Sequence, residues 1–422
     1  SQGALFPELR KAAGVYPLSM TYVAKGKSSK STLYLNAGDT YIVGVPETVA
    51  VTLSANAGTV NGRSFVMPAK AASLTVTVDA ANIADLTTFP NESVYVVTNA
   101  AGFTTLATAV NGGKTFAGKS FYMLGDIDMG NANHTPIGKF DTNSSWKTSF
   151  SGKFYGNNFK ILNLNVNNTS LNGGGLFGSC YQAYFNNLHI FNGSVTVANR
   201  AGGIAGYADA CTFEYCTNGA SIKSTTGSDG IGGLAGVARI NSVFNYCGNY
   251  GTVTATKNGA AGIAGWGQDN IQMTGCFNAG KVTATADVGA FARVKAGYTP
   301  AFTDCYYLKN ACSTTVAGKA YTERDFRAGV IASYINTSYR TKTSNGVFTG
   351  TPVIPAVRNQ NQQPAVCTRL SAYDDGISLG YQTICANLGD DIPYTNALNY
   401  YSNTPFSAPD ALTARTNPTG VP

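Results

Sequence analysis

A glycine-led tetrapeptide recurs along the middle of this chain at nearly constant spacing. The copies are Gly175-Leu-Phe-Gly178, Gly203-Ile-Ala-Gly206, Gly233-Leu-Ala-Gly236 and Gly262-Ile-Ala-Gly265, followed by a degraded Gly289-Ala-Phe-Ala292. The first four copies are 28, 30 and 29 residues apart, and short runs of β-forming residues separate them. A unit of this length cannot bury its own apolar face, so neighbouring units must stack to make a continuous core. The repeat therefore predicts an all-β fold built around a β-solenoid, with one coil for each copy.

A second set of residues keeps the same register between the glycine pairs. Each coil contributes one member, and the set is Leu188, Cys216, Cys247, Cys276 and Cys305. Buried cysteine behaves as a small apolar residue, so the set predicts an inward ladder of free thiols, with disulfides between rungs as the alternative. The glycines are expected where the chain needs a positive φ or a close backbone approach. We expect about six coils between residues 149 and 309.

These motifs resemble the GLUG-motif β-helix proteins of bacterial surfaces. The segment Phe121-Tyr-Met-Leu-Gly-Asp126-Ile-Asp128-Met, then Pro136-Ile-Gly and Phe150-Ser-Gly-Lys-Phe-Tyr-Gly-Asn, is similar to the lead-in that such proteins carry. The resemblance covers residues 95–340 and implies a solenoid on an adhesin-like surface protein without assigned chemistry. The piece Gly62-Arg-Ser-Phe65-Val-Met67-Pro68-Ala resembles the small β-domains of internalin-type B-repeats.

The remaining segments divide the chain into five parts. Apolar residues at helical spacing from Phe103 to Val110, followed by Gly112, predict a short helix over the N-terminal end of the solenoid. A capping box at Thr322–Asp325 predicts a second helix, continuing to Ile335, over the other end. The predicted parts are an extended segment (1–20), a small β-domain (21–90), the solenoid with its lead-in helix (95–310), a C-terminal cap (311–352) and an extended Pro/Asn-rich tail (353–422).

Composition narrows the classes of function. Charged residues make up only 12 % of the 422 residues, hydrophobic residues 44 %, and the net charge is +7. Lys and Arg form no run or stripe, so a nucleic-acid partner is not expected. No apolar stretch is long enough to span a membrane, and two histidines are too few for the usual zinc sites. The start at Ser1 fits a secreted protein after signal removal, so an extracellular or cell-surface location is expected.

Acidic residues are sparse in the coils, which argues against an enzyme. Glycoside hydrolysis needs two carboxylates facing one groove. Asp209, Arg239 and Gln268 occupy equivalent positions of successive coils, with Asp269 next to the last, so a polar groove along one edge is conceivable. Trp266 is the one tryptophan of the coils that could serve as a sugar platform. We expect scattered solvent-facing polar residues here and no catalytic or cofactor-binding residues.

Calcium and a disulfide complete the candidate sites. Asp126 with Asp128, and the pairs Asp374-Asp375 and Asp390-Asp391, are either turn residues or oxygen ligands for calcium. No residue set is assigned as a metal site, and calcium is the one ion left open. Cys367 and Cys385 are the best disulfide candidates of the nine cysteines, because they lie in a segment with little other core.

The function predicted from these observations is that of a non-enzymatic extracellular structural or surface protein acting in assembly or adhesion. It would be a filament or fibre subunit joined through its terminal segments, or a carbohydrate-binding adhesin module. A polysaccharide-active β-helix enzyme is the third reading. The expected partners are further copies of the chain, other surface proteins, or glycans.

Overall fold

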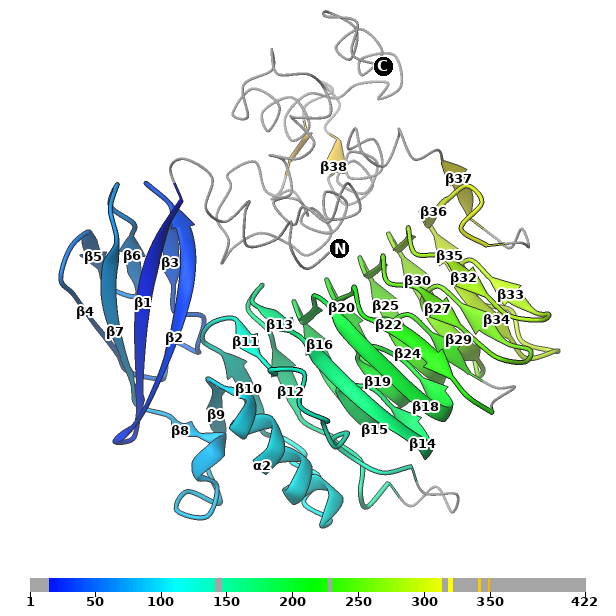
Figure 1. Cartoon of the computed structure of the whole chain (residues 1–422), viewed down its shortest axis with the longest axis horizontal. Helices are drawn as coiled ribbons and strands as arrows, with labels where there is room; N and C mark the ends of the chain where they lie inside the picture. The colour runs from blue at the N-terminus through cyan, green and yellow to red at the C-terminus, as the bar shows by residue number, and fades with distance from the viewer. Residues whose placement is uncertain are drawn as a thin grey trace, which may run out of the picture.

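The computed structural model describes residues 15–140, 146–226, 230–312 and 318–321, together with β38 (Thr341–Lys342) and β39 (Phe348–Thr349). Within these residues a small β-domain is followed by a parallel β-solenoid of about seven turns, seen side-on in Figure 1. The predicted β-solenoid is thus confirmed. It has more turns than expected because the segment before residue 149 already winds as a coil, with β10 (Ser120–Met123) paired in parallel to β12 (Lys153–Tyr155).

Each coil runs through four parallel sheets, whose strands pair with the equivalent strands of the coils before and after. The nine-stranded sheet contains β8 (Ala81–Asn82), β9 (Val94–Val97), β10, β12, β16 (Tyr184–Asn186), β20 (Thr212–Glu214), β25 (Val243–Asn245), β30 (Gln272–Thr274) and β35 (Ala301–Thr303). The next sheet contains β11 (Ile127–Asp128), β13 (Lys160–Leu162), β17 (His189–Ile190), β21 (Thr217–Asn218), β26 (Gly248–Asn249), β31 (Phe277–Asn278), β36 (Tyr306–Leu308) and β37 (Lys319–Tyr321).

The other two sheets complete the coil. The third contains β14 (Leu164–Gly174), β18 (Gly193–Ala201), β22 (Ser221–Ser224), β27 (Val253–Thr254), β32 (Val282–Thr283), β23 (Ile231–Gly232), β28 (Ala260–Ala261) and β33 (Val288–Gly289). The fourth, which we call the groove sheet, contains β15 (Phe177–Tyr181), β19 (Ala205–Asp209), β24 (Ala235–Arg239), β29 (Ala264–Gly267) and β34 (Ala292–Val294). Because the stacking is in register, like residues of successive coils lie ~4.8 Å apart.

Ladders of like side chains fill the interior. A phenylalanine ladder from the nine-stranded sheet includes Phe185, Phe213 and Phe244, whose rings stack at 5.0 and 4.7 Å between centroids. The predicted ladder of Leu188, Cys216, Cys247, Cys276 and Cys305 lies at the following corner, and each of these side chains is at most 3 % exposed. The four cysteines are free, and the Cys247 thiol donates to the Phe213 carbonyl oxygen at 3.4 Å.

A buried asparagine ladder two residues further on packs against the first glycine of three of the repeats. Asn218, Asn249 and Asn278 are fully buried, and each amide nitrogen of the first two donates to the next side-chain oxygen at 2.9 Å. A Cβ on Gly203, Gly233 or Gly262 would come within 2.0–2.4 Å of atoms of these side chains. Close packing, and not a positive φ, therefore requires glycine at these positions.

The second glycine of each repeat meets backbone instead. A Cβ would come within 2.6 Å of the backbone at Gly206 and Gly236, within 2.1 Å at Gly265 and within 2.3 Å at Gly178. Of the eight repeat glycines only Gly175 has a positive φ, of 157°. Of the two reasons expected for glycine at these positions, a positive φ applies at Gly175 alone, and close approach of neighbouring atoms accounts for the other seven.

The small β-domain consists of two sheets packed on one core. A four-stranded sheet has the order β2 (Lys27–Asn36), β1 (Val15–Ala24), β7 (Ala72–Val78), β4 (Val51–Ala55), and a three-stranded sheet has the order β3 (Thr40–Ile42), β6 (Ser64–Val66), β5 (Thr59–Asn61). The expected extended segment 1–20 therefore ends earlier, since residues 15–20 belong to β1. The β-domain also ends earlier than residue 90, because β8 pairs with β9 and continues the nine-stranded sheet.

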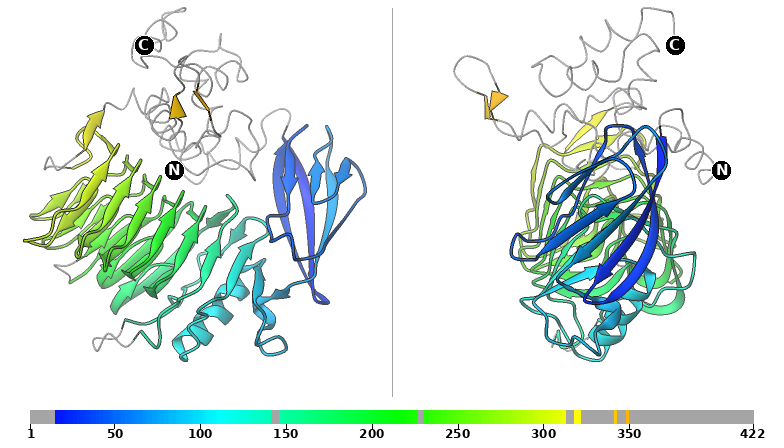
Figure 2. Two further views of the ribbon diagram at one scale, coloured as in Figure 1. Left: turned by 180° about the vertical axis from the view of Figure 1, so that it is seen from behind. Right: turned by 90° about the vertical axis from the view of Figure 1, so that its left-hand side faces the viewer.

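The N-terminal end of the solenoid is covered from two sides. The 3-10 helix η1 (Ile83–Asp85) and α2 (Ala100–Asn111) connect the first strands of the nine-stranded sheet, and Phe103 of α2 stacks on Phe154 at 5.9 Å. This is the predicted helix, which ends at Gly112. The β-domain lies over the rest of that end (Figure 2), where the Tyr41 hydroxyl donates to the Leu124 carbonyl oxygen at 2.9 Å.

Several predicted features lie outside the described residues. They are residues 1–14 of the extended segment, the helix beginning at Thr322, the tail from residue 353 and the Cys367–Cys385 pair. No helix described in the structure is both long and apolar enough to cross a membrane.

Candidate functional site

One position recurs on each of the five strands of the groove sheet, directly after the second glycine of the repeat or its equivalent. Its occupants from coil to coil are Ser179, Tyr207, Val237, Trp266 and Arg293. Ser179 pairs with Tyr207, Tyr207 with Val237 and Val237 with Trp266, so these positions form a row along the solenoid axis. We call this the axial row. Its residues differ in size and charge from coil to coil, although the core around them repeats.

Val237 lies between Tyr207 and Trp266 in the axial row. Because its side chain is smaller than either ring, a groove of about 420 Å³ is left above it. The groove is open to solvent and is lined by Phe140, Arg200, Tyr207, Val237, Arg239, Trp266, Gln268 and Lys295. We call it the aromatic groove. Three of its residues are aromatic and three are cationic, and none of the residues that line it is acidic.

The wall nearest the N-terminus is a stack of two rings and a guanidinium. Phe140, from the segment before Phe150, lies parallel to Tyr207 with 3.7 Å between centroids. The Arg200 guanidinium lies 5.7 Å from the Phe140 ring centroid and 5.4 Å from that of Tyr207, within cation–π range. It also donates to the side-chain oxygen of Asn172 at 3.0 Å. These contacts hold the Arg200 charge at the mouth of the groove.

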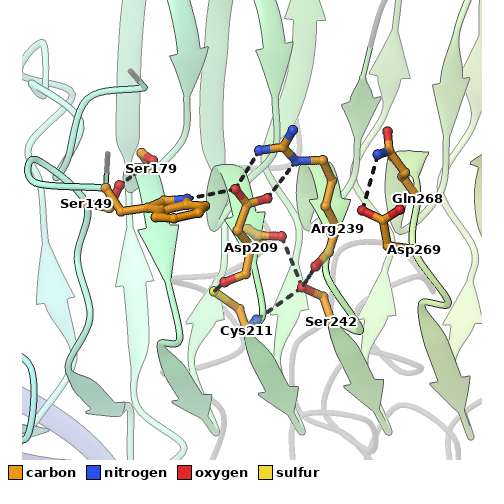
Figure 3. Close-up of polar contacts among 10 residues, drawn as sticks. Ser149, Ser179, Asp209, Cys211, Arg239, Ser242, Gln268 and Asp269 are labelled. Carbon is orange, nitrogen blue, oxygen red and sulfur yellow. Dashed lines mark hydrogen bonds and ion pairs between the residues drawn. The ribbon is translucent and has the colours of Figure 1, made fainter. Parts of the chain in front are cut away.

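A buried carboxylate holds Arg239 in place (Figure 3). Asp209 is 3 % exposed and accepts from Arg239 through Nε to Oδ1 at 2.8 Å and Nη2 to Oδ2 at 2.6 Å. The Trp146 indole N–H donates to the same Oδ2 at 3.0 Å, and the Trp146 ring stacks on Tyr181 at 4.2 Å. Hydrogen bonding to Asp209 raises the pKa of Arg239. Asp209 therefore supports the groove from beneath and does not face its interior.

A second hollow lies on the other side of Trp266. It has a volume of about 620 Å³ and is lined by Trp266, Asp287, Val288, Gly289, Ala292, Arg293 and Val294. The Arg293 guanidinium lies 5.0 Å from the Trp266 ring centroid, and its Nη2 is 3.2 Å from Asp287 Oδ2. Its Nη1 is buried and has no hydrogen-bond partner among the described residues.

The four polar residues that the sequence placed along one edge, Asp209, Arg239, Gln268 and Asp269, lie close together in the structure but make different contacts. Asp209 and Arg239 form the ion pair, Gln268 lines the groove, and Asp269 accepts from Gln268 at 3.2 Å (Figure 3). Six residues of the site were not predicted from the sequence: Phe140, Arg200, Tyr207, Val237, Arg293 and Lys295. The position after each second glycine, where Tyr207 and Trp266 stand, was a signal that could have found the axial row. Phe140 and Arg200 carry no comparable pattern.

Asp126 and Asp128, which the sequence offered as calcium ligands, form hydrogen bonds with nearby backbone and side-chain groups. Asp126 accepts from the Lys160 backbone N–H at 2.8 Å, and Asp128 accepts from Gly130 N–H at 2.8 Å and from Asn163 at 2.9 Å. Across the part of the chain that the structure describes, no three His, Cys, Asp or Glu side chains gather as a metal site. The two acidic pairs near residues 374 and 390 lie outside that part, so calcium binding stays a prediction.

Apolar ring faces beside fixed cations are suited to sugars. The faces of sugar rings pack on aromatic side chains, while guanidinium and amide groups hydrogen-bond hydroxyl and acidic oxygens. The groove offers both in one open depression on a rigid sheet, which is a binding arrangement. The carboxylate of Asp209, which supports the groove, has its oxygens occupied by Arg239 and Trp146.

Comparisons with known proteins do not identify a family or a function for this chain. No protein-family profile matches the chain, and no curated protein matches it. A solved structure that does match is that of a Bacteroides ovatus protein described as a candidate immunoglobulin A1 protease. It is 19 % identical, the match covers 60 % of this chain and 90 % of that chain, and the TM-score is 0.40. At this similarity the match carries no argument about activity.

Proposed function

We propose that this chain is a non-enzymatic surface protein that binds glycans through the aromatic groove. The observation that carries the proposal is the groove itself, in which Tyr207 and Trp266 flank the smaller Val237, Phe140 stacks on Tyr207, and cationic residues complete the lining. A rigid solenoid that presents such a groove on one face suits adhesion to polysaccharide. Kinship with GLUG-motif surface proteins and a location outside the cell are part of the same proposal.

The state of the carboxylates supports binding over catalysis. A glycosidase needs one carboxyl group free to donate a proton and a second free to attack or to activate water. Asp209 is buried and paired, and Asp269 accepts from its neighbour Gln268. We therefore expect bound polysaccharide to keep its chain length.

Binding can be tested by affinity electrophoresis and calorimetry against a panel of neutral and acidic polysaccharides. Trp266→Ala is expected to remove binding while the thermal midpoint changes little, because Trp266 is partly exposed. Tyr122→Ala is the matched control. Tyr122 is also a partly exposed aromatic, stacked on Tyr155 at 4.6 Å on the nine-stranded sheet away from the groove.

Two results would contradict the proposal. Equal loss of binding in both variants, or no binding to any member of the panel, would remove the groove as a glycan site. Release of reducing or unsaturated ends that disappears in Asp209→Asn or Asp269→Asn would show that the protein is an enzyme.

A further inference from the structure

We propose that the glycan is an acidic chain that lies along the axial row, with its carboxylate or sulfate groups on Arg200, Lys295 and Arg293. This inference rests on the proposed function and assigns the class of ligand. It draws on three separate observations: the charge of the lining residues, an unsatisfied guanidinium, and the direction of the row.

The charge of the groove is positive where a ligand would touch it. Arg200, Arg239 and Lys295 line the groove, and Asp209 offsets only Arg239, which it pairs bidentately. Lys295 is exposed, and its ammonium lies 5.6 Å from the Tyr298 ring centroid. Two cations thus remain for a ligand, and like charges gathered in a depression attract an anion.

Arg293 supplies a third guanidinium beyond Trp266, and Asp287, which lines the same hollow, pairs with its Nη2 at 3.2 Å and leaves Nη1 for a ligand. Its side chain is only 12 % exposed, and Asp287, its ion-pair partner, is 63 % exposed. The buried Nη1 has no partner among the described residues, and a buried N–H without an acceptor is costly. Guanidinium N–H groups donate strong charge-assisted hydrogen bonds to carboxylate and sulfate oxygens, so an acidic group of the ligand in the second hollow would satisfy this nitrogen.

The direction of the row implies a chain and not a single sugar. Tyr207, Val237, Trp266 and Arg293 occupy successive coils, so three rung spacings separate the first from the last, about 14 Å at ~4.8 Å per rung. Trp266 stands between the aromatic groove and the second hollow and lines both. A polymer running parallel to the solenoid axis would place rings over Phe140 and Trp266 and acidic groups at the cations on either side.

The test compares polymers that share a backbone and differ in charge. Polygalacturonate is paired with its fully methyl-esterified form, and dextran sulfate with dextran, in titration calorimetry at 50 and 300 mM NaCl. We expect the charged member of at least one pair to bind about tenfold more tightly than the uncharged member, with affinity falling at the higher salt. Binding of dextran sulfate but not polygalacturonate would support the inference and identify sulfate as the group recognised.

Single substitutions test which cationic residues bind the acidic groups of the polymer. Arg293→Met, Arg200→Met and Lys295→Met are each expected to weaken binding of the charged polymer about tenfold, and to weaken binding of the uncharged polymer by a smaller factor, because only the charged polymer loses an ionic contact. Lys223→Met, at an exposed lysine on β22 of a different sheet, is the matched control and should bind like the parent.

The two proposals fail in different ways. Equal affinity for both members of each pair would overturn the acidic ligand while glycan binding stands. An equal loss in Lys223→Met would show general surface attraction and also overturn it. Absence of binding to all four polymers, and to the wider neutral panel, would overturn the proposed function itself.

Discussion

At the scale of single residues, the buried pair Asp209–Arg239 links the core to the groove. Asp209 has 4 % of its side chain exposed and Arg239 has 25 %, so the pair sits at the boundary between interior and solvent. Removing one partner leaves a buried charge without compensation, whereas removing both does not. The pair therefore offsets the charge of Arg239 at the edge of the groove.

We predict that Arg239→Met lowers the free energy of unfolding by about 3 kcal/mol. The reason is the Asp209 carboxylate, which would keep only the Trp146 N–H as a side-chain partner. The double variant Asp209→Leu with Arg239→Met should recover most of the loss. Urea denaturation followed by circular dichroism measures both, and equal stability of the single and double variants would contradict the argument.

The buried thiols make a second residue-scale prediction, which concerns alkaline pH. Burial raises the pKa of Cys211 from 9.0 to about 12 and raises that of Cys180 as well. The folded state thus holds these protons above pH 9, where the unfolded chain releases them. Their contribution to stability is complete below pH 9 and is lost as the pH rises from 9 toward 12.

We therefore expect the thermal midpoint to fall between pH 8.5 and 10.5, with each such thiol contributing about 1 kcal/mol per pH unit above pH 9. Cys211→Ala should start from a lower midpoint and show a shallower slope over the same range. Parallel slopes for parent and variant would indicate that other groups, such as the buried Tyr22 and Tyr41, cause the fall.

At the scale of elements, the coil is held by ladders that depend on one another. The asparagine ladder occupies the space that a side chain at the first repeat glycine would need. For Gly203 the three nearest atoms to an added Cβ all belong to Asn218, at 2.0–3.0 Å. Asn218 in turn accepts from Ala220 N–H at 3.1 Å and donates to the Ala220 carbonyl at 3.0 Å.

A double-mutant cycle tests this dependence. Gly203→Ala alone is expected to cost about 2–3 kcal/mol, because backbone and asparagine cannot both keep their places. In an Asn218→Gly background the same change should cost less than 1 kcal/mol, giving a coupling energy above 1 kcal/mol. Additive effects in chemical denaturation would mean that the glycine is required for another reason.

Element by element, periodicity indicated the solenoid and helical spacing indicated α2, because both patterns repeat the apolar face that must be buried. Two other features were not predictable. Asn218 and its counterparts are polar residues whose burial only becomes favourable once coils stack and their amides meet. Phe140 stands outside the repeat, and only the three-dimensional course of its segment places it over Tyr207.

At the scale of the whole molecule, the β-domain and the solenoid share one apolar core. The buried cluster runs without a break from Leu18 to Tyr307. Tyr41 is central to the junction. Its hydroxyl reaches the Leu124 carbonyl, and its ring lies 6.1 Å from that of Phe159. Asn157 also crosses the junction, donating to the Gly44 and Met123 carbonyl oxygens at 2.8 and 2.9 Å.

We predict one cooperative transition for both parts in scanning calorimetry. Tyr41→Ala should open the junction and separate the trace into two transitions, with the β-domain unfolding first. The expected loss is about 3–5 kcal/mol for a large buried aromatic residue. Tyr16→Ala, at a partly exposed tyrosine of the same domain, is the comparison and should keep the single transition. Two transitions in the parent protein would refute the shared core.

The axial row has an evolutionary consequence. Each strand of the groove sheet contributes one side chain to it, while the repeat glycines and the buried asparagines are fixed by packing. If the row binds glycans as proposed, a point mutation at its partly exposed member Trp266 would change the recognition surface while the core stays in place, and duplication of one coil would insert a new recognition unit of ~4.8 Å between existing ones. Specificity in such a protein can diversify by substitution of single residues in the row and by a change in the number of coils, and the two routes are independent.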